Sequence, residues 1–218
     1  MDSQKINQQF RSSHPLDIVR WAVDQAVLRG GPVIVSTNFR PLEAVILDLC
    51  VRAKPDMAVL WADSGYMLEE TYRLADKVEK QLKLNLKIFN PLMTAARRDA
   101  LFGPVPLLPE NPTPEEDAAV HAFSEQVKLE PFRRGLAELK PAVWITGLRR
   151  EQNPFRQTLD IISDENGLLK VNPVFEWSEA QMEAYLKERG LPDEKRYFDA
   201  AKANEKRECG LHKPGFLK

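Results

Sequence analysis

The stretch PVIVS at 32–36, with MAVLWA at 57–62 and NLKIF at 85–89 after it, decides the fold of this chain. The first two runs are short and apolar, as buried strands are, and the third is expected to be a strand as well. Between them, 41–51 and 68–82 have the spacing of helices. Three strand–helix steps in a row require right-handed crossovers, so they predict an α/β fold with a mostly parallel sheet flanked by helices in three layers.

The pattern continues on both sides of this stretch. Ser12 or Ser13 is expected to cap a helix over 15–29, which Gly30 and Gly31 end. The segment 103–114 contains five prolines and is expected to be a loop. The remaining expected elements are helices near 115–126 and 131–139, a strand at 142–146, a hairpin of 159–163 with 168–172 around Asp164–Gly167, and a helix over 178–189 capped by Ser178.

Composition indicates a globular chain with no charge signature for nucleic acid. The 218 residues are 43% hydrophobic and 29% charged, and the formal net charge is −1. We expect a single domain over 1–190 and a mobile C-terminal tail over 191–218, where the sequence is polar and weakly patterned.

The termini, apolar runs and cysteines exclude several classes of protein. The N-terminus lacks the apolar core of a signal peptide, and no apolar run approaches the roughly 20 residues that span a bilayer. We therefore expect a cytoplasmic protein without a membrane partner. Two cysteines exclude a disulfide framework and a four-cysteine cluster from one chain, and three scattered histidines do not suggest a zinc site.

Two polar segments directly follow expected strands, at the edge where an open parallel sheet binds ligands. Hydroxyl and amide side chains before a helix can cradle a phosphate, although a plain helix cap is the simpler interpretation. After the second strand, an aspartate can accept from a ribose or amino group and a glycine permits a tight turn, although an ordinary turn explains both. The candidate residues are Ser36, Thr37, Asn38 and Phe39 in the first segment and Asp63 and Gly65 in the second.

The segment after the fourth strand contains three arginines, Arg149, Arg150 and Arg156. Arginine suits multidentate recognition of phosphate or sulfate, so this cluster is a stronger signal than either segment above. The alternative is a solvated turn with a few surface ion pairs.

The two cysteines have different surroundings in the sequence. Cys50 lies on an apolar helix face and is expected to be a small buried side chain. Cys209 lies near the C-terminus among charged residues, where Lys206, Arg207 and His212 favour a thiolate and Glu208 opposes it. Cys209 is therefore the candidate nucleophile.

These segments carry a resemblance to a known family. KRECGLH at 206–212 resembles the C-terminal signature of the 3′-phosphoadenylyl sulfate (PAPS) reductases, thioredoxin-dependent enzymes of sulfate assimilation. The pattern of that family is also similar across most of the chain, at WADSGYMLEETYRLADKV (61–78), LKLNLKIF (82–89), WITGLRREQNPFRQTL (144–159) and KVNPVFEWSEAQMEAYLKERGL (170–191).

The resemblance implies both a fold and a mechanism. The fold is the adenine nucleotide alpha hydrolase-like type of the PP-loop ATP pyrophosphatases. The mechanism is attack by the Cys209 thiolate on the sulfur of PAPS, which leaves S-sulfocysteine and adenosine 3′,5′-bisphosphate; reduced thioredoxin then releases sulfite. The implied substrate-binding residues are the candidates above together with Lys206, Arg207 and His212, and a homodimer is expected.

The resemblance also bears on cofactors. Relatives that use adenylyl sulfate (APS) bind an iron–sulfur cluster through a Cys-Cys pair and a later C-x-x-C. The corresponding segment here, FSEQVKLEP at 123–131, has no cysteine, so we expect no cofactor besides thioredoxin or glutaredoxin as electron donor.

Two departures from the family pattern leave alternatives open. Arg40 stands where a glycine is expected, and LPDEKRYFDAAKANEK at 191–206 replaces a longer stretch before ECGLH. The alternatives to a PAPS reductase are a cluster-free APS reductase and a weakened nucleotide-binding protein of sulfur metabolism.

Overall fold

The computed structural model describes residues 2–107, 109–202, 210, 211 and 216. The N-terminal half contains α1 (Ser3–Phe10), α2 (Pro15–Leu28), β1 (Val33–Thr37), α3 (Ala44–Ala53), β2 (Ala58–Ala62), α4 (Glu69–Leu82), β3 (Asn85–Phe89) and α5 (Ala95–Phe102). The rest contains α6 (Pro114–Ser124), the π-helix η1 (Glu125–Leu129), α7 (Glu130–Leu139), β4 (Val143–Ile145), η2 (Arg150–Gln152), α8 (Pro154–Gln157), β5 (Ile162–Glu165), β6 (Leu168–Val171), α9 (Glu179–Arg189) and η3 (Ala200–Lys202).

The described strands form one sheet of six in the order β3-β2-β1-β4-β6-β5. All neighbours are parallel except β5 and β6, which form the expected hairpin. The order reverses between β1 and β4, because the chain builds outward from β1 in one direction and from β4 in the other. The loops after β1 and β4 therefore separate there and leave room for a ligand.

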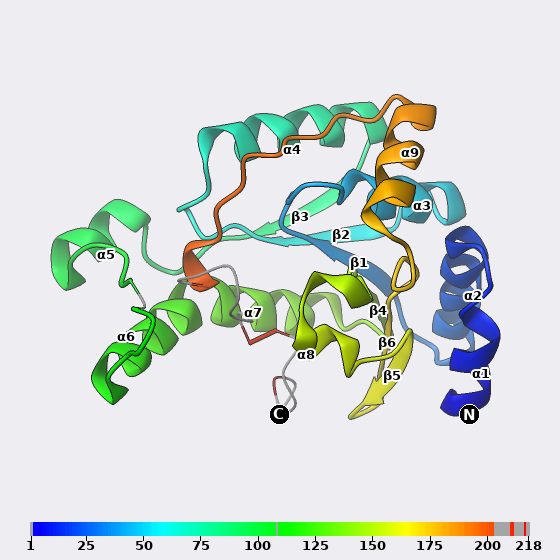
Figure 1. Ribbon diagram of the computed structural model, residues 1–218, viewed down its shortest axis with the longest axis horizontal. Coiled ribbons are helices and arrows are strands. Elements are labelled where there is room, and N and C mark those ends of the chain that lie inside the picture. Colours follow the sequence, from blue (N-terminus) through cyan, green and yellow to red (C-terminus); the bar gives the residue numbers. More distant parts are fainter. Residues whose placement is uncertain (1, 108, 203–209, 212–215, 217–218) are drawn as a thin grey trace.

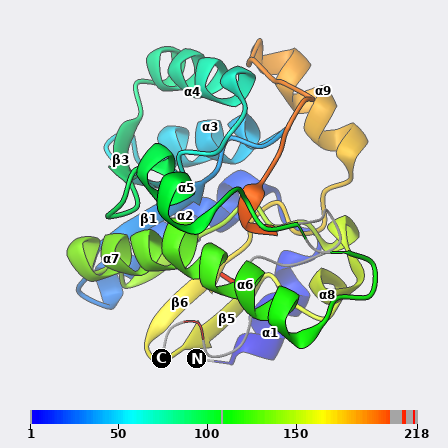
Figure 2. The same ribbon diagram turned by 90° about the vertical axis from the view of Figure 1, so that its left-hand side faces the viewer.

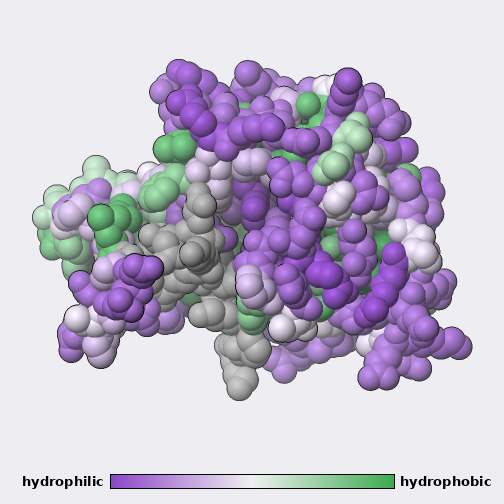
Figure 3. Space-filling view, viewed as in Figure 1, coloured by the Kyte–Doolittle hydropathy of each residue, from purple (hydrophilic) through white to green (hydrophobic). Residues whose placement is uncertain are grey.

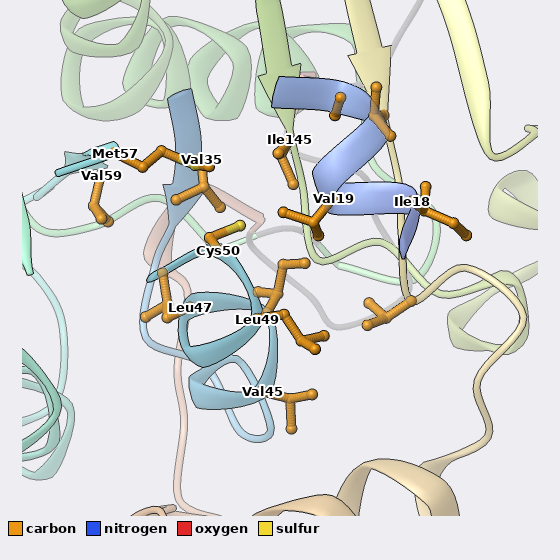
Figure 4. Packing of buried hydrophobic residues seen from close by; sticks show 14 of the residues in the cluster. Ile18, Val19, Val35, Val45, Leu47, Leu49, Cys50, Met57, Val59 and Ile145 are labelled. Carbon is orange, nitrogen blue, oxygen red and sulfur yellow. The ribbon is translucent and has the colours of Figure 1, made fainter. Parts of the chain in front are cut away.

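Helices cover both faces of the sheet (Figures 1 and 2). Alternate residues of β1 point to opposite faces, so Val33 and Val35 join a core with α2, α3, α4 and α9, while Ile34 faces α7. Figure 4 shows Cys50 within the first of these cores, beside Val35. Its side chain is buried, and burial raises the pKa of the thiol, as expected for a structural cysteine.

Several element boundaries differ from the sequence-based expectation. His14 caps α2, because its Nδ1 accepts from the amide of Leu16 at 3.2 Å, and Ser12 and Ser13 do not. The third helix starts at Ala44 and not near Pro41. The hairpin turn is shorter than expected, with Asn166 and Gly167 both at positive φ, which is the backbone of a two-residue type I′ turn.

The helices expected near 115–126 and 131–139 are one continuous rod (Figure 1). Pro131 has no N–H to donate, and the turn before it widens into the π-helix η1, where the Glu130 amide bonds to the carbonyl of Glu125. This widened turn buries Lys128, whose side chain would otherwise be expected in solvent.

Residues 191–202, here named the strap, cross the molecule from the end of α9 to α6 (Figure 1). The strap contacts the body at several points, and Ala200 and Ala201 are buried. Its hydrogen bonds join Asp193 to the amide of Leu42, Arg196 to Glu70, Tyr197 to Asn38, Asp199 to Lys128, and the carbonyl of Ala201 to Ser124. This first part of the expected tail is thus packed against the domain.

The surface drawn in Figure 3 is mostly hydrophilic, with apolar side chains gathered at α5 and the loop after it. Leu101 and Phe102 are exposed there. Among the described residues, no helix is long and apolar enough to cross a membrane.

Candidate active site

A small cavity of about 60 Å³ lies at the point where the strand order reverses. The loops after β1 and β4 form its floor, and η1, α7 and the strap form its walls. Its lining residues are Ser36, Thr37, Asn38, Arg40, Glu43, Ala62, Lys128, Phe132, Thr146, Gly147, Leu148, Arg156, Tyr197, Lys202 and Leu211. Four of them are cationic and one is a carboxylate; Lys128 is paired with Asp199 behind the wall, and the remaining cations still outnumber Glu43, so the cavity favours an anion.

The loop after β1 is closed by a carboxylate from the start of the next helix. Glu43 accepts from the Thr37 hydroxyl at 2.6 Å and from the Asn38 amide at 2.9 Å. The Asn38 side chain lies within hydrogen-bond distance of both Glu43 and Tyr197. Thr37 and Asn38 line the cavity as expected, but these donors already have a carboxylate partner.

Two other residues of the first candidate segment have structural contacts. Ser36 lines the cavity, and its hydroxyl accepts from the Trp144 indole at 2.8 Å. Phe39 is buried with φ +50° and packs edge-on against Trp61, at 4.9 Å between ring centroids. Phe39 therefore shapes the loop from below without lining the cavity.

The second candidate segment forms a turn outside the cavity lining. Asp63 accepts from the amide of Gly65 at 2.9 Å, the hydroxyl of Tyr72 at 2.8 Å and the side chain of Asn90 at 3.2 Å. Gly65 has φ +77°, which suits glycine. These bonds describe the ordinary turn that was the simpler interpretation.

The three arginines after β4 point to different places. Arg156 is buried and lines the cavity. Arg149 is also buried but forms an ion pair with Glu151 and does not line the cavity. Arg150 forms an ion pair with Glu176 at 2.6 Å and stacks over the Phe175 ring, beside a separate hollow. The structure thus brings only Arg156 of this cluster to the cavity.

A buried ion pair fastens the strap to the wall of the cavity. Lys128 of η1 and Asp199 of the strap form this pair, with side chains only 5% and 7% exposed. Burial alone would raise the pKa of the Asp199 carboxyl, yet the neighbouring Lys128 ammonium holds it below its ordinary value. Burial, and the charge of Asp199, raise the pKa of the Tyr197 hydroxyl well above its usual range, so it remains protonated.

Sequence reasoning missed several residues of the cavity wall, among them Glu43, Lys128, Tyr197 and Lys202. Arg40 was noted as a departure from the family pattern, and it also lines the cavity. The signal for Lys128 was weak, because one lysine in a charged helix is ordinary and the sequence shows neither the π-helical turn nor the pairing with Asp199. Tyr197 and Lys202 lie in a segment without an apolar pattern, so nothing in the sequence placed them near the sheet.

The candidate nucleophile Cys209 lies outside the described residues, as do Lys206, Arg207 and His212. Leu211, two positions after Cys209, is described, and it lines the cavity. Leu211 and Phe216 pack in the core between the sheet and α7, the one that contains Ile34. Within the described part of the chain, no group of three metal-ligating side chains could hold an ion.

The mostly parallel six-stranded sheet between two layers of helices defines an α/β protein, and its structural neighbours are of the adenine nucleotide alpha hydrolase-like type. An NMN synthetase from Francisella tularensis shares this fold, with a TM-score of 0.54 and 11% identity over 85% of this chain and 71% of that chain. An NH3-dependent NAD synthetase from Campylobacter jejuni also shares this fold. Its TM-score is 0.50, with 16% identity over 88% of this chain and 75% of that chain.

Residues 32–202 match the family model described as the phosphoadenosine phosphosulfate reductase domain. Similar proteins include phosphoadenosine 5′-phosphosulfate reductases from Synechococcus, 32% identical over 86% of this chain and 77% of that protein, and Vibrio atlanticus, 31% identical over 95% and 85%. The crystal structure of a PAPS reductase from Candida auris in a phosphate complex has a TM-score of 0.69 and 25% identity, covering 87% of this chain and 86% of that chain. The chain belongs to the PAPS reductase family.

Proposed function

We propose that this protein is a cytoplasmic, thioredoxin-dependent PAPS reductase of assimilatory sulfate reduction. It converts PAPS to sulfite and adenosine 3′,5′-bisphosphate through an S-sulfocysteine at Cys209. The observation that carries the proposal is a cation-lined cavity at the reversal point of the sheet, whose wall includes Leu211 of the ECGLH segment.

The nucleophile follows from a comparison of the two cysteines. Cys50 is 1% exposed, and burial disfavours its thiolate, so it can neither reach a substrate nor attack one. Cys209 lies within three positions of Lys206, Arg207 and His212 in the sequence and two positions from Leu211 of the cavity wall. Support for Cys209 therefore comes from both the packing and the sequence.

The proposed reaction has two covalent steps. In the first, the Cys209 thiolate attacks the sulfur of PAPS, an S–S bond forms, and the electron pair of the breaking S–O bond moves to the 5′-phosphate oxygen. In the second, one thiolate of reduced thioredoxin attacks the Cys209 sulfur and expels sulfite. The second thioredoxin thiol then closes a disulfide and returns Cys209 as a thiolate, so the dithiol supplies both electrons.

The cations of the cavity would stabilise the leaving phosphate. Negative charge grows on the 5′-phosphate as the S–O bond breaks, and fixed cations in a partly dry site lower the energy of that charge. Arg156 and Lys128 are both buried, which limits their screening by water. Lys202 adds a further cation to the wall.

A sulfite-release assay tests the proposal directly. The purified protein is given reduced thioredoxin or glutaredoxin and either PAPS or APS, and sulfite is measured over time. Faster release of sulfite from PAPS than from APS supports the proposal. Faster release of sulfite from APS than from PAPS indicates a cluster-free APS reductase. If the protein binds nucleotide but releases sulfite from neither substrate, it is a binding protein.

A further inference from the structure

A second cavity of about 370 Å³ adjoins the first one on the side of the strap. The two cavities share Arg40, Tyr197 and Lys202, so these residues form the boundary between them. The second cavity is also lined by Pro41, Gln152, Lys195, Phe198 and Asp199. Small-molecule sites commonly have about 300–1,000 Å³, and the first cavity is too small to hold a whole nucleotide.

The charges of the second cavity favour an anion. Three of its lining residues are cationic, Arg40, Lys195 and Lys202. Its one carboxylate, Asp199, is already paired with Lys128. Lys195 bonds to Glu183 at 3.0 Å, but its side chain is 80% exposed and can turn towards a ligand.

The backbone around Arg40 holds this side chain at the boundary. Phe39 and Leu42, on either side of Arg40-Pro41, both have positive φ, at 50° and 72°. Such conformations are costly for residues with side chains and persist only where the surroundings enforce them. Here the Phe39 ring is fixed against Trp61, and the Leu42 amide donates to Asp193 of the strap at 2.8 Å.

Arg40 also has an unsatisfied donor. Its Nε is buried and has no hydrogen-bond partner among the described residues. A buried donor without a partner is unfavourable, and hydrogen bonds between charged groups are stronger than neutral ones. An anion beside the guanidinium would satisfy this donor.

We infer that the second cavity holds the 3′-phosphate of the nucleotide, and that Arg40 and Lys195 distinguish a 3′,5′-bisphosphate from a 5′-monophosphate. The inference rests on the proposed function, because it takes the first cavity as the place of the 5′-phosphate. Two adjoining cationic cavities suit one ligand that carries two phosphates on the same ribose. Arg40 and Lys195 thus have a specificity role that the arginines after β4 do not share.

Calorimetric titration tests this inference without turnover. The probes are adenosine 3′,5′-bisphosphate and adenosine 5′-monophosphate, which differ only in the 3′-phosphate, and the quantity compared is the ratio of their affinities. Wild-type protein should prefer the bisphosphate by about tenfold or more. Arg40→Gln should remove most of this preference, and Arg40→Lys, which keeps the charge, should restore part of it.

Lys195 has a matched control on another face. Lys195→Met should reduce the preference by about twofold to fivefold, as expected for an exposed charge. Lys80→Met removes a lysine that is 75% exposed and paired with Asp76, and it should leave the preference unchanged.

The possible outcomes separate the two proposals. Equal wild-type affinity for both probes, or an Arg40→Gln variant that weakens both probes equally, overturns the 3′-phosphate site while sulfite release still supports the reductase. Binding of neither probe by the wild-type protein overturns both.

Discussion

At the scale of single residues, neighbours in the sequence have different roles in this protein. Arg149, Arg150 and Arg156 form one cluster in the sequence, yet only Arg156 reaches the cavity. Arg149 has an extended backbone and Arg150 begins a short 3-10 turn, so their side chains leave the chain in different directions. Arg149 forms an ion pair with Glu151, and Arg150 forms one with Glu176.

Arg156→Ala is expected to weaken nucleotide binding by about 1.5–3 kcal/mol, the usual contribution of a charged hydrogen bond. Arg150→Ala is the matched control, because its loss breaks the Glu176 pair and the Phe175 stacking outside the cavity. Calorimetry with adenosine 3′,5′-bisphosphate measures both variants. Equal losses in the two variants would place the phosphate elsewhere.

The two cysteines give a second prediction at this scale. Cys209→Ser should abolish sulfite formation and leave nucleotide affinity nearly unchanged, because the described cations of the cavity remain. PAPS without thioredoxin should add one sulfonate to the wild-type peptide that contains Cys209, as seen by mass spectrometry. Activity retained in Cys209→Ser would contradict the covalent mechanism.

Cys50→Ser is the control for that experiment. It should react normally but lose about 1–3 kcal/mol of unfolding free energy, since it places a hydroxyl among the apolar side chains of Figure 4. Urea unfolding measures this loss.

At the scale of elements, the π-helix η1 links the helical rod to the strap. It buries Lys128, and that ammonium pairs with Asp199 across 71 positions of sequence. π-helical turns are frequent at functional sites, and this one places a cation in the cavity wall. The same contact fastens the segment that leads towards the ECGLH motif.

Asp199→Asn should destabilise the protein by about 3–5 kcal/mol, because it leaves the Lys128 charge without this buried partner. Exchanging both residues for apolar ones, Lys128→Met with Asp199→Leu, should cost less than the single change. Urea unfolding at about pH 7 measures both variants.

The same pair predicts a dependence of stability on pH. The pKa of Asp199 is lower in the folded state than its ordinary value, so the pair stabilises the fold above that ordinary value. The stabilisation is lost as the pH falls through the lowered pKa. The difference between wild type and Asp199→Asn should therefore stay constant from about pH 7 to about pH 5 and shrink as the pH falls below about 4, and a difference that does not shrink there would contradict the prediction.

At the scale of the whole molecule, the order of the strands decides where the chemistry can occur. Successive strands are added on one side of β1 and on the other side of β4, so the loops after these two strands diverge at their carboxyl ends. Residues of β1, η1 and the strap line the cavity there, together with Leu211. Segments far apart in sequence thus form one cationic cavity.

The purified protein is expected to be colourless and without stoichiometric iron, because two cysteines in one chain cannot ligate a four-iron cluster. Metal analysis and an absorption spectrum measure this. About four irons per chain, with a shoulder near roughly 400 nm, would contradict it and favour an APS reductase.

The sequence by itself determined the class of fold and the family. Apolar runs such as PVIVS and MAVLWA predict strands because burial on both faces demands continuous apolar residues, and the structure confirms the mostly parallel sheet. The position of the polar residues after β1, at the edge where an open parallel sheet binds ligands, was also predicted, since the carboxyl ends of parallel strands meet at that edge. Cys209 was predicted as the nucleophile from the sequence, and it lies outside the residues that the structure describes.

Only the tertiary structure decided which charged residues line the cavity. Lys128 is in a charged helix and Lys202 is in a segment without pattern, and neither sequence context shows what packs against it. The directions of the arginines were equally hidden, because Arg150 lies in η2 and pairs with Glu176, whereas Arg156 lies in α8 and lines the cavity. Local patterns in the sequence predict which residues are buried against a sheet, whereas contacts between distant segments depend on how the whole chain folds.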